Sequence, residues 1–316
     1  MTSRNSDSFT LFDASPLALG CWALGGKGWG GQSERDSMEV MDAAYECGIR
    51  HFDTAQIYGV SEDLVGRFLV DRREEVFLAS KVYPKGGADD VRAVLQRSLE
   101  KLKTDYIDLY YLHWPVPGQD IRKQMEVLAA AKEEGLIKAI GVSNYSVDQI
   151  RQAGEVARID CLQSGYHLFW RKIEDEVLPY CRETGIRVVS YSSLGQGILT
   201  GKFPLSLAFP KGDHRADRVI HFQPQTWPSV HEAVEQLKPL AREAGRPLSH
   251  LAIRWCASRN GIRGVLVGAR NARQVRENVA AMDGELDPSI LDRMTRISEA
   301  LMPRIPSGGH IFDLGS

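Results

Sequence analysis

The chain has 316 residues, of which 25% are charged and 43% hydrophobic, and its formal net charge at pH 7 is −2. A nucleic-acid-binding protein normally needs a clustered excess of lysine and arginine to neutralise phosphates, so this balance argues against that class and favours a small partner. The length fits either two ordinary domains or one α/β barrel, since such barrels often exceed about 250 residues.

Five cysteines are spread singly, without C-x-x-C spacing, a pattern that predicts neither a disulfide framework nor a zinc site and that fits a reducing compartment. They are Cys21, Cys47, Cys161, Cys181 and Cys256. Residues 1–10 lack the apolar stretch of a signal peptide, and no apolar run approaches the about 18 residues that a membrane span needs. We therefore expect a soluble cytoplasmic protein with no metal site and no membrane or nucleic-acid partner.

Short apolar runs rich in β-branched and aromatic residues alternate with longer amphipathic stretches, which is typical of a parallel sheet covered by helices. The predicted strands, in chain order, are 17–20, 50–53, 76–82, 107–113, 138–143, 160–166, 187–191 and 264–268. Gly48, Gly135 and Gly185 each follow a helical pattern, where a left-handed C-cap is expected.

About eight strand–helix units without a dividing linker predict one closed (β/α)8 TIM barrel over residues 1–316, in preference to an open doubly wound sheet. The longest irregular region, 195–228, follows the seventh strand. Loops of this length are usually functional, so we expect it over the barrel mouth, with a solvated insertion as the alternative. Helices over 230–244 and 248–258 precede the last strand, a closing helix covers 289–301, and the final residues are expected to form a tail.

The segment 26–31 fits the G-x-G-x-x-G dinucleotide fingerprint, and Asp53 follows near the Rossmann distance of ~20 residues. Its glycines lie past the predicted strand end instead of in the tight turn, and bulky Trp29 stands where the backbone would have to approach a pyrophosphate. Asp53 also belongs to a second motif. We interpret the segment as a loop after the first strand.

Four ionisable side chains lie at or just after the ends of neighbouring predicted strands, namely Asp53 and Tyr58, then Lys81, then His113. All strands of a (β/α)8 barrel end at one mouth, so we expect these four to converge there. A tyrosine hydroxyl has a pKa near ~10, and a nearby ammonium lowers it. Tyr58 is therefore predicted to protonate an oxygen that gains negative charge, while Asp53 holds Lys81 charged and His113 donates a hydrogen bond to that oxygen. Each of these four residues alone could have an ordinary structural role, but packing does not readily explain why all four lie at the ends of neighbouring strands.

These motifs resemble those of the aldo-keto reductases, particularly the bacterial and plant branch related to potassium-channel beta subunits. The resemblance extends over almost the whole chain and is carried by Asp53-Thr54-Ala55 with Tyr58-Gly59, Ser80-Lys81 and Leu112-His113-Trp114. It implies a nicotinamide cofactor bound extended across the barrel mouth. It also implies reversible NADP(H)-dependent reduction of an aldehyde or ketone to an alcohol, with hydride from the cofactor and a proton from Tyr58.

The same resemblance implies that Asn144 and Gln163 hold the carboxamide of the cofactor and that Tyr191 stacks on its nicotinamide ring. The other residues implied to border the cofactor are Gly20, Trp22, Ser143, Ser192, Leu194, Gly197, Gly268, Arg270, Gln274, Glu277 and Asn278. Arg270, with Arg273 behind it, is expected to bind the adenosine 2′-phosphate, because guanidinium groups bind phosphate bidentately. This favours NADP(H) over NAD(H). The alternatives are that the arginines only border solvent and that Glu277 only lies on a helix surface.

Four aromatic residues, Trp22, Trp29, Tyr83 and Trp114, are expected to line an apolar pocket for a small carbonyl or sugar-like substrate. Two other functions stay open. One is an aldose or polyol dehydrogenase working in the oxidative direction, and the other is a redox-sensing regulatory subunit that binds the cofactor and turns over slowly.

Overall fold

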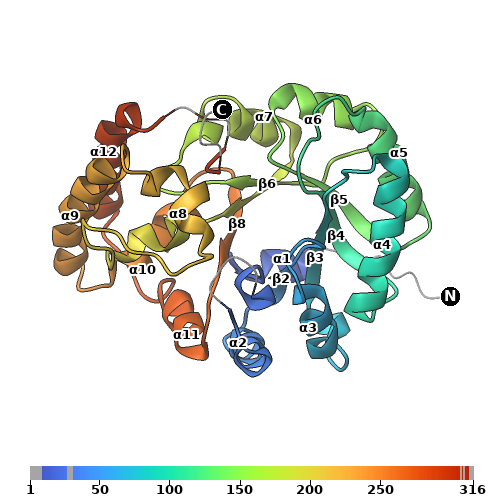
Figure 1. Cartoon of the computed structure of the whole chain (residues 1–316), viewed down its shortest axis with the longest axis horizontal. Helices are drawn as coiled ribbons and strands as arrows, with labels where there is room; N and C mark the ends of the chain where they lie inside the picture. Colours follow the sequence, from blue (N-terminus) through green and yellow to red (C-terminus); the bar gives the residue numbers. More distant parts are fainter. Residues whose placement is uncertain (1–8, 27–30, 307, 309, 313–316) are drawn as a thin grey trace.

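The computed structural model describes residues 9–26, 31–306, 308 and 310–312. Eight parallel strands form a closed barrel in which β8 pairs back onto β1 (Figure 1). The strands are β1 Leu17–Gly20, β2 His51–Asp53, β3 Phe77–Val82, β4 Ile107–Leu112, β5 Ile137–Ser143, β6 Cys161–Gly165, β7 Arg187–Tyr191 and β8 Ile262–Val267. The predicted (β/α)8 barrel is confirmed, with individual strand ends shifted by one or two residues.

The helices surround this barrel (Figure 1). The longer ones are α2 Glu34–Glu46, α3 Ser61–Phe68, α4 Ala88–Leu102, α5 Ile121–Glu133, α6 Val147–Gly154, α7 Val177–Thr184, α9 Trp227–Glu243, α10 Leu248–Ala257, α11 Ala272–Ala280 and α12 Pro288–Leu301. Local signals set several of their ends. Ser146 and Gln149 form a capping box at the start of α6, and Gly185 ends α7 with a left-handed φ of 71°.

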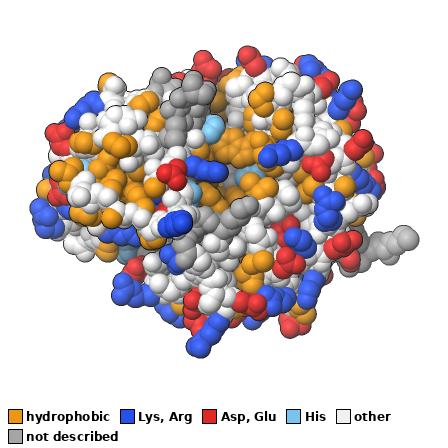
Figure 2. Space-filling view, viewed as in Figure 1, with side chains coloured by type: hydrophobic (Ala, Val, Ile, Leu, Met, Phe, Trp, Pro, Cys, Tyr) orange, Lys and Arg blue, Asp and Glu red, His pale blue; other side chains and the backbone are white. Residues whose placement is uncertain are grey.

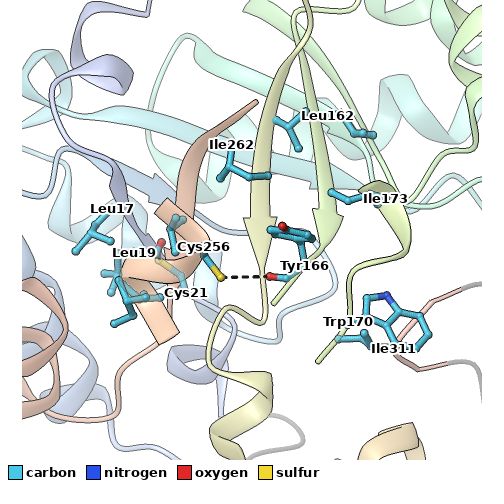
Figure 3. Close-up of a cluster of buried hydrophobic side chains, with 14 of the residues drawn as sticks. Leu17, Leu19, Cys21, Leu162, Tyr166, Trp170, Ile173, Cys256, Ile262 and Ile311 are labelled. Atoms are coloured by element: carbon cyan, nitrogen blue, oxygen red, sulfur yellow. Dashed lines mark hydrogen bonds between the residues drawn. The ribbon is translucent and has the colours of Figure 1, made fainter. Parts of the chain in front are cut away.

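Two layers of apolar packing hold the barrel. The short helix α1, Thr10–Asp13, contains Phe12 and is preceded by Phe9, and the rings of Phe9 and Phe12 lie 5.4 and 5.3 Å from that of Phe77 at the start of β3. These rings therefore close the amino end of the barrel. Outside it, strands and helices share a larger core, part of which Figure 3 shows around Tyr166 and Cys256, whose thiol lies 3.9 Å from the Tyr166 carbonyl oxygen.

The segment after β7 crosses the barrel mouth, as predicted. It contains the 3-10 turns η4 Gly195–Thr200 and η5 Ile220–Phe222 and the helix α8 His214–Arg218. The His214 ring lies 4.6 Å from that of Trp22, which follows β1 on the other side of the mouth. The expectation of a tail is wrong for the described residues near the C-terminal end, because Ile311 is 1% exposed and its carbonyl accepts a hydrogen bond from the Ile220 amide.

The closed strand order also contradicts the dinucleotide-fingerprint alternative, since that motif belongs to an open doubly wound sheet. Residues 27–30 of the fingerprint, including Trp29, lie outside the described residues. Within the described part of the chain, no helix combines the length and apolar character needed to cross a membrane.

Candidate active site

The four predicted ionisable residues meet at the carboxyl end of the barrel. Asp53 ends β2, Lys81 lies in β3, His113 follows β4, and Tyr58 lies in the loop before α3. The Lys81 ammonium donates to Asp53 Oδ1 and, at 2.8 Å, to the Thr54 carbonyl oxygen. The Tyr58 hydroxyl lies 3.5 Å from His113 Nε2, and Lys81 Nζ lies 5.0 Å from the centre of the Tyr58 ring.

The Asp53–Lys81 ion pair is buried beneath Tyr58, with side chains 3% and 0% exposed. Burial raises the pKa of the Asp53 carboxyl above its ordinary value, against the opposing effects of the Lys81 charge and of hydrogen bonds from Lys81 and Gln163. The bond from Gln163 Nε2 reaches the second oxygen of Asp53, Oδ2, at 2.8 Å. Both carboxylate oxygens are thus bound within the barrel.

The expected lowering of the Tyr58 pKa by Lys81 is not found. Burial raises the pKa of Tyr58 well above its ordinary value, and the charge of Asp53 adds to the effect. The reason is geometric, because Lys81 donates to Asp53 and to a carbonyl and lies against the face of the Tyr58 ring. Tyr58 therefore faces a nearly neutral ion pair and stays protonated, as a proton donor must.

His113 is neutral for a similar reason. Burial lowers its pKa well below the ordinary value for histidine, and the charge of Lys81 lowers it further. A neutral imidazole carries a single N–H. It can donate one hydrogen bond toward the space above Tyr58 without supplying a proton of its own.

Packing against the loop that follows β1 fixes the backbone of Tyr58, a feature that the sequence analysis missed. The Ser61 hydroxyl donates to the Cys21 carbonyl oxygen at 3.0 Å and lies 2.8 Å from Thr54 Oγ1. Gly25 lies so close to Tyr58 that a Cβ at this glycine would stand 1.7 Å from the Tyr58 carbonyl oxygen. Only a residue without a side chain fits there.

The residues predicted around the nicotinamide are brought together at the ends of β5, β6 and β7. The Tyr191 hydroxyl donates to Asn144 Oδ1 at 2.7 Å, and Asn144 Nδ2 donates to Ser143 Oγ at 3.0 Å. Asn144 and Ser192 have left-handed backbones, with φ of 65° and 57°. Such conformations are rare outside glycine and cluster at functional sites, so they mark this wall of the mouth.

The predicted phosphate-binding residues lie on the rim between β8 and α11. The Arg270 guanidinium donates to the Gly31 carbonyl oxygen at 2.6 Å, and its amide donates to Gln274 Oε1 at 2.8 Å. Arg273 forms an exposed ion pair with Glu277 at 3.1 Å. Arg270 thus connects the β8 side of the mouth to the segment before α2, whereas Arg273 points along the surface of α11.

The remaining predicted cofactor residues lie beside this rim of the barrel mouth. Asn278 Nδ2 donates to the Gly268 carbonyl oxygen at 3.2 Å, and a Cβ at Gly268 would stand 3.9 Å from the carbonyl oxygen of Gly20. On the other side, η4 turns sharply at Gly197, whose amide donates to the Leu194 carbonyl oxygen at 3.0 Å.

Two cations that were not among the predicted site residues, Lys202 and Arg215, lie beside η4 and near the predicted Arg270. The pKa of Lys202 is lowered by partial burial and by the positive charges of Arg215 and Arg270, while Asp213 opposes the shift. Asp213 pairs with Arg215 at 2.5 Å. Three cations with one carboxylate form a local environment suited to an anion.

Aromatic rings cover the mouth. Trp22 lies 5.9 Å from Tyr58 with the ring planes 22° apart, and Trp114 lies 6.3 Å from His113. Tyr83 lies beyond β3, with the Lys85 ammonium 5.2 Å from its ring centre. Figure 2 shows a hollow of hydrophobic side chains at the centre of this face, with lysine and arginine side chains at its border.

The C-terminal segment completes the cover, although no motif or periodicity marks it in the sequence. The Phe312 ring lies 5.9 Å from Trp22 and 6.4 Å from Tyr191, with only 3° between the planes of Phe312 and Tyr191. The His310 ring lies 4.5 Å from Trp114. These rings therefore pack against residues predicted for the nicotinamide site and for the substrate pocket.

Comparison with known proteins shows relatives along nearly the full chain. Aldo-keto reductase YhdN of Bacillus subtilis is 37% identical over 280 residues, covering 84% of each chain. The NADH-specific methylglyoxal reductase of Escherichia coli is 34% identical over 314 residues, covering 91% of this chain and 95% of that protein. A probable voltage-gated potassium channel subunit beta of Oryza sativa is 29% identical, with 93% of this chain and 95% of that protein covered.

Solved structures agree with these relatives. The glycerol dehydrogenase AKR11B4 of Gluconobacter oxydans has a TM-score of 0.83 at 30% identity, covering 92% of this chain and 93% of that one. An aldo/keto reductase of Klebsiella pneumoniae in complex with NADP and acetate has a TM-score of 0.72 at 25% identity, with 96% of each chain covered. The model of the aldo/keto reductase family matches residues 16–299. The chain therefore belongs to the aldo/keto reductase family of oxidoreductases, as its four-residue motif indicated.

Proposed function

We propose that this protein is an NADP(H)-dependent carbonyl reductase in which Tyr58 donates the proton that converts an aldehyde or ketone to an alcohol. The observation that carries the proposal is the position of the Tyr58 hydroxyl, 3.5 Å from His113 Nε2 and above the buried Asp53–Lys81 pair. We also propose that residues 1–316 act as one catalytic domain, because the two halves of the barrel supply different parts of this site.

In this proposal the four residues have separate tasks. A bound nicotinamide supplies the hydride. Tyr58 protonates the oxygen that becomes negative, and the neutral imidazole of His113 donates a hydrogen bond to the same oxygen. Once Tyr58 has lost its proton, the nearby Lys81 ammonium stabilises the phenolate, with Asp53 holding that ammonium in place. Proton donation of this kind accelerates a reaction by roughly 10²- to 10⁴-fold.

Two clusters of residues at the barrel mouth support binding of a nicotinamide dinucleotide phosphate. Asn144 and Ser192 hold strained backbones at the proposed nicotinamide end, and Lys202, Arg215 and Arg270 gather positive charge near η4. Such a cluster supports binding of the cofactor phosphates and favours NADP(H). The Klebsiella pneumoniae relative in complex with NADP supports the same choice, while the NADH-specific Escherichia coli relative makes the comparison of both cofactors necessary.

The decisive test is Tyr58→Phe, which removes only the hydroxyl. We expect NADPH to bind with an unchanged dissociation constant and kcat for aldehyde reduction to fall by about 100-fold or more. Tyr180→Phe, on α7 outside the barrel, serves as the matched control and is expected to keep full turnover. If Tyr58→Phe also keeps full turnover, Tyr58 is not the proton donor.

The phosphate contact has its own test in Arg270→Ala. The dissociation constant for NADPH is expected to rise about tenfold or more, since a charge-assisted hydrogen bond contributes about 1.5–3 kcal/mol, whereas that for NADH should change little. Equal effects on the two cofactors would contradict a 2′-phosphate contact.

Two further functions have specific support. Oxidation of a polyol is favoured by the structural likeness to a glycerol dehydrogenase, and it predicts a higher kcat/KM for NADP with a sugar or polyol than for NADPH with an aldehyde. Redox sensing is favoured by the relatives named as potassium channel subunits, and it predicts tight cofactor binding, slow turnover over a broad carbonyl panel and a stable protein partner.

A further inference from the structure

Gln163 connects two parts of the site that were assigned separate tasks above. It lies in β6, four strands from β2 in the eight-stranded barrel, and so reaches Asp53 from the opposite wall. Its Nε2 donates to Asp53 Oδ2 at 2.8 Å, and both residues are 2% exposed. Lys81 occupies the other carboxylate oxygen, so Gln163 is the second donor that compensates the buried charge.

The charge of Asp53 decides which way the Gln163 amide points. An ionised carboxylate can only accept hydrogen bonds, so the amide must direct its NH2 group at Asp53 and keep its oxygen for another partner. A protonated carboxyl can instead donate, which permits the amide to turn over. In the proposed function, the amide oxygen is the atom that would accept from the NH2 of a cofactor carboxamide.

We propose that Gln163 is a positioning residue that couples nicotinamide binding to the charge of the Asp53–Lys81 pair. The inference rests on the proposed function, since it needs a cofactor carboxamide at Gln163. The inference goes beyond that function because it assigns two roles to the Gln163 side chain. Gln163 holds Asp53 in place, and Asp53 in turn fixes the orientation in which the Gln163 amide contacts the cofactor.

The groups that face Asp53 come from each neighbouring element. They are Lys81 from β3, Cys21 from the end of β1, Tyr58 from the loop before α3, and Tyr111 from β4. Burial raises the pKa of the Cys21 thiol and of both tyrosine hydroxyls, so these three groups stay neutral from acid to neutral pH. Asp53 is then the member of this set that changes charge as the pH falls.

The test compares Gln163→Met with Gln124→Met. Methionine has nearly the volume of glutamine and no donor, and Gln124 is also 2% exposed, but its amide donates to Gln119 on the outside of the barrel. The dissociation constant for NADPH is measured by fluorescence from pH 5 to 8 in both variants and in the wild-type protein. The 2′-phosphate titrates alike in all three and cancels in their ratios.

We expect Gln163→Met to bind NADPH about tenfold more weakly than wild type at pH 7.5, as the loss of about one hydrogen bond predicts. This ratio should fall toward one as the pH is lowered, because protonation of Asp53 removes the charge that orients the amide in the wild-type protein. Gln124→Met should follow the wild-type curve throughout. A ratio for Gln163→Met that stays constant with pH overturns the coupling.

Thermal unfolding without cofactor provides the second readout. Losing a donor raises the pKa of Asp53 in the folded state further, and a raised carboxyl pKa costs stability as the pH rises through it. The deficit in melting temperature of Gln163→Met should therefore grow from pH 5 to 8, while that of Gln124→Met stays constant. Equal pH dependence in both variants overturns the proposal, and Gln163→Leu replaces the methionine variant if that protein does not fold.

The two readouts distinguish this inference from the proposed function. If the wild-type protein binds neither NADPH nor NADH, the proposed function fails and the proposed coupling fails with it, even where the unfolding data confirm the contact to Asp53. If the cofactor binds and Gln163→Met shows no pH-dependent change, the proposed function stands and the coupling fails.

Discussion

Gly25→Ala tests whether the loop after β1 sets the position of the proton donor. A Cβ at Gly25 would stand 1.7 Å from the Tyr58 carbonyl oxygen and 2.7 Å from its carbonyl carbon, whereas real Cβ atoms essentially never approach within 3.0 Å of such an atom. The two backbones must therefore separate by more than an ångström. Both contacted atoms are backbone, so no side-chain rotation relieves the clash.

The expected losses of kcat and of stability follow from this displacement. A misplacement of about 1 Å at a reacting group costs roughly 100-fold in rate, and overpacking a buried site costs roughly 1–3 kcal/mol of stability. We expect kcat of Gly25→Ala to fall by about 100-fold, with a lower melting temperature but a folded barrel. NADPH binding should change much less than kcat, because the proposed nicotinamide contacts lie at the ends of β5, β6 and β7.

The assay is steady-state carbonyl reduction with NADPH, together with circular dichroism and cofactor titration. Gly154→Ala is the matched control, since its Cβ would meet nothing within 4 Å and its backbone is helical. That variant should be fully active and slightly more stable. Wild-type kcat in a folded Gly25→Ala protein would refute the positioning argument.

Three other predictions concern the cover of the site, its acid stability and its thiols. Phe312→Ala removes a ring that packs on Trp22. We expect KM for small aldehydes to rise about three- to tenfold, because aromatic contacts of about 0.5–1.5 kcal/mol are lost. An unchanged KM would place Phe312 outside the pocket. Burial lowers the pKa of His221 to about 4, so the folded protein resists a proton that the unfolded chain accepts below about 6.5. Stability should thus fall from pH 6.5 toward 4 by up to about 3 kcal/mol from this residue, and His221→Gln should flatten the slope of melting temperature against pH; an unchanged slope would contradict the assignment. Cys47 is half-buried while the other four cysteines are buried, so mass spectrometry after brief alkylation should find label at Cys47 first, and rapid labelling elsewhere would show that the barrel opens.

Much of the fold could be predicted because its signals are local. Each strand is a short apolar run between turn residues, and each boundary glycine follows a helix. Strand ends moved by one or two residues because pairing with neighbours decides them; β8 begins at Ile262, for example, since this residue pairs with Val188 of β7. The register of a strand depends on its neighbours in the sheet, so the exact strand ends cannot be predicted from the strand's own residues.

The catalytic residues could also be predicted, because one topological fact places the carboxyl ends of parallel strands together. The pKa of Tyr58 could not, since it depends first on the burial of the hydroxyl and then on the charge of Asp53 beside it, both of which arise only in the packed barrel. The same limit applies to Gly25, whose importance arises from one close backbone approach, and to Phe312, which no periodicity or motif marks.

The pairing of β1 with β8 has a consequence for how this protein folds during its synthesis on the ribosome. Leu17 and its neighbours emerge first, yet one edge of their strand finds its partner, Val265, only after almost the whole chain has been synthesised. Until then an apolar edge stays open in the nascent chain, and such edges invite aggregation. Cellular yield should thus depend on how quickly the last strand is synthesised, so that slow codons shortly before β8 reduce it although they leave every active-site residue unchanged.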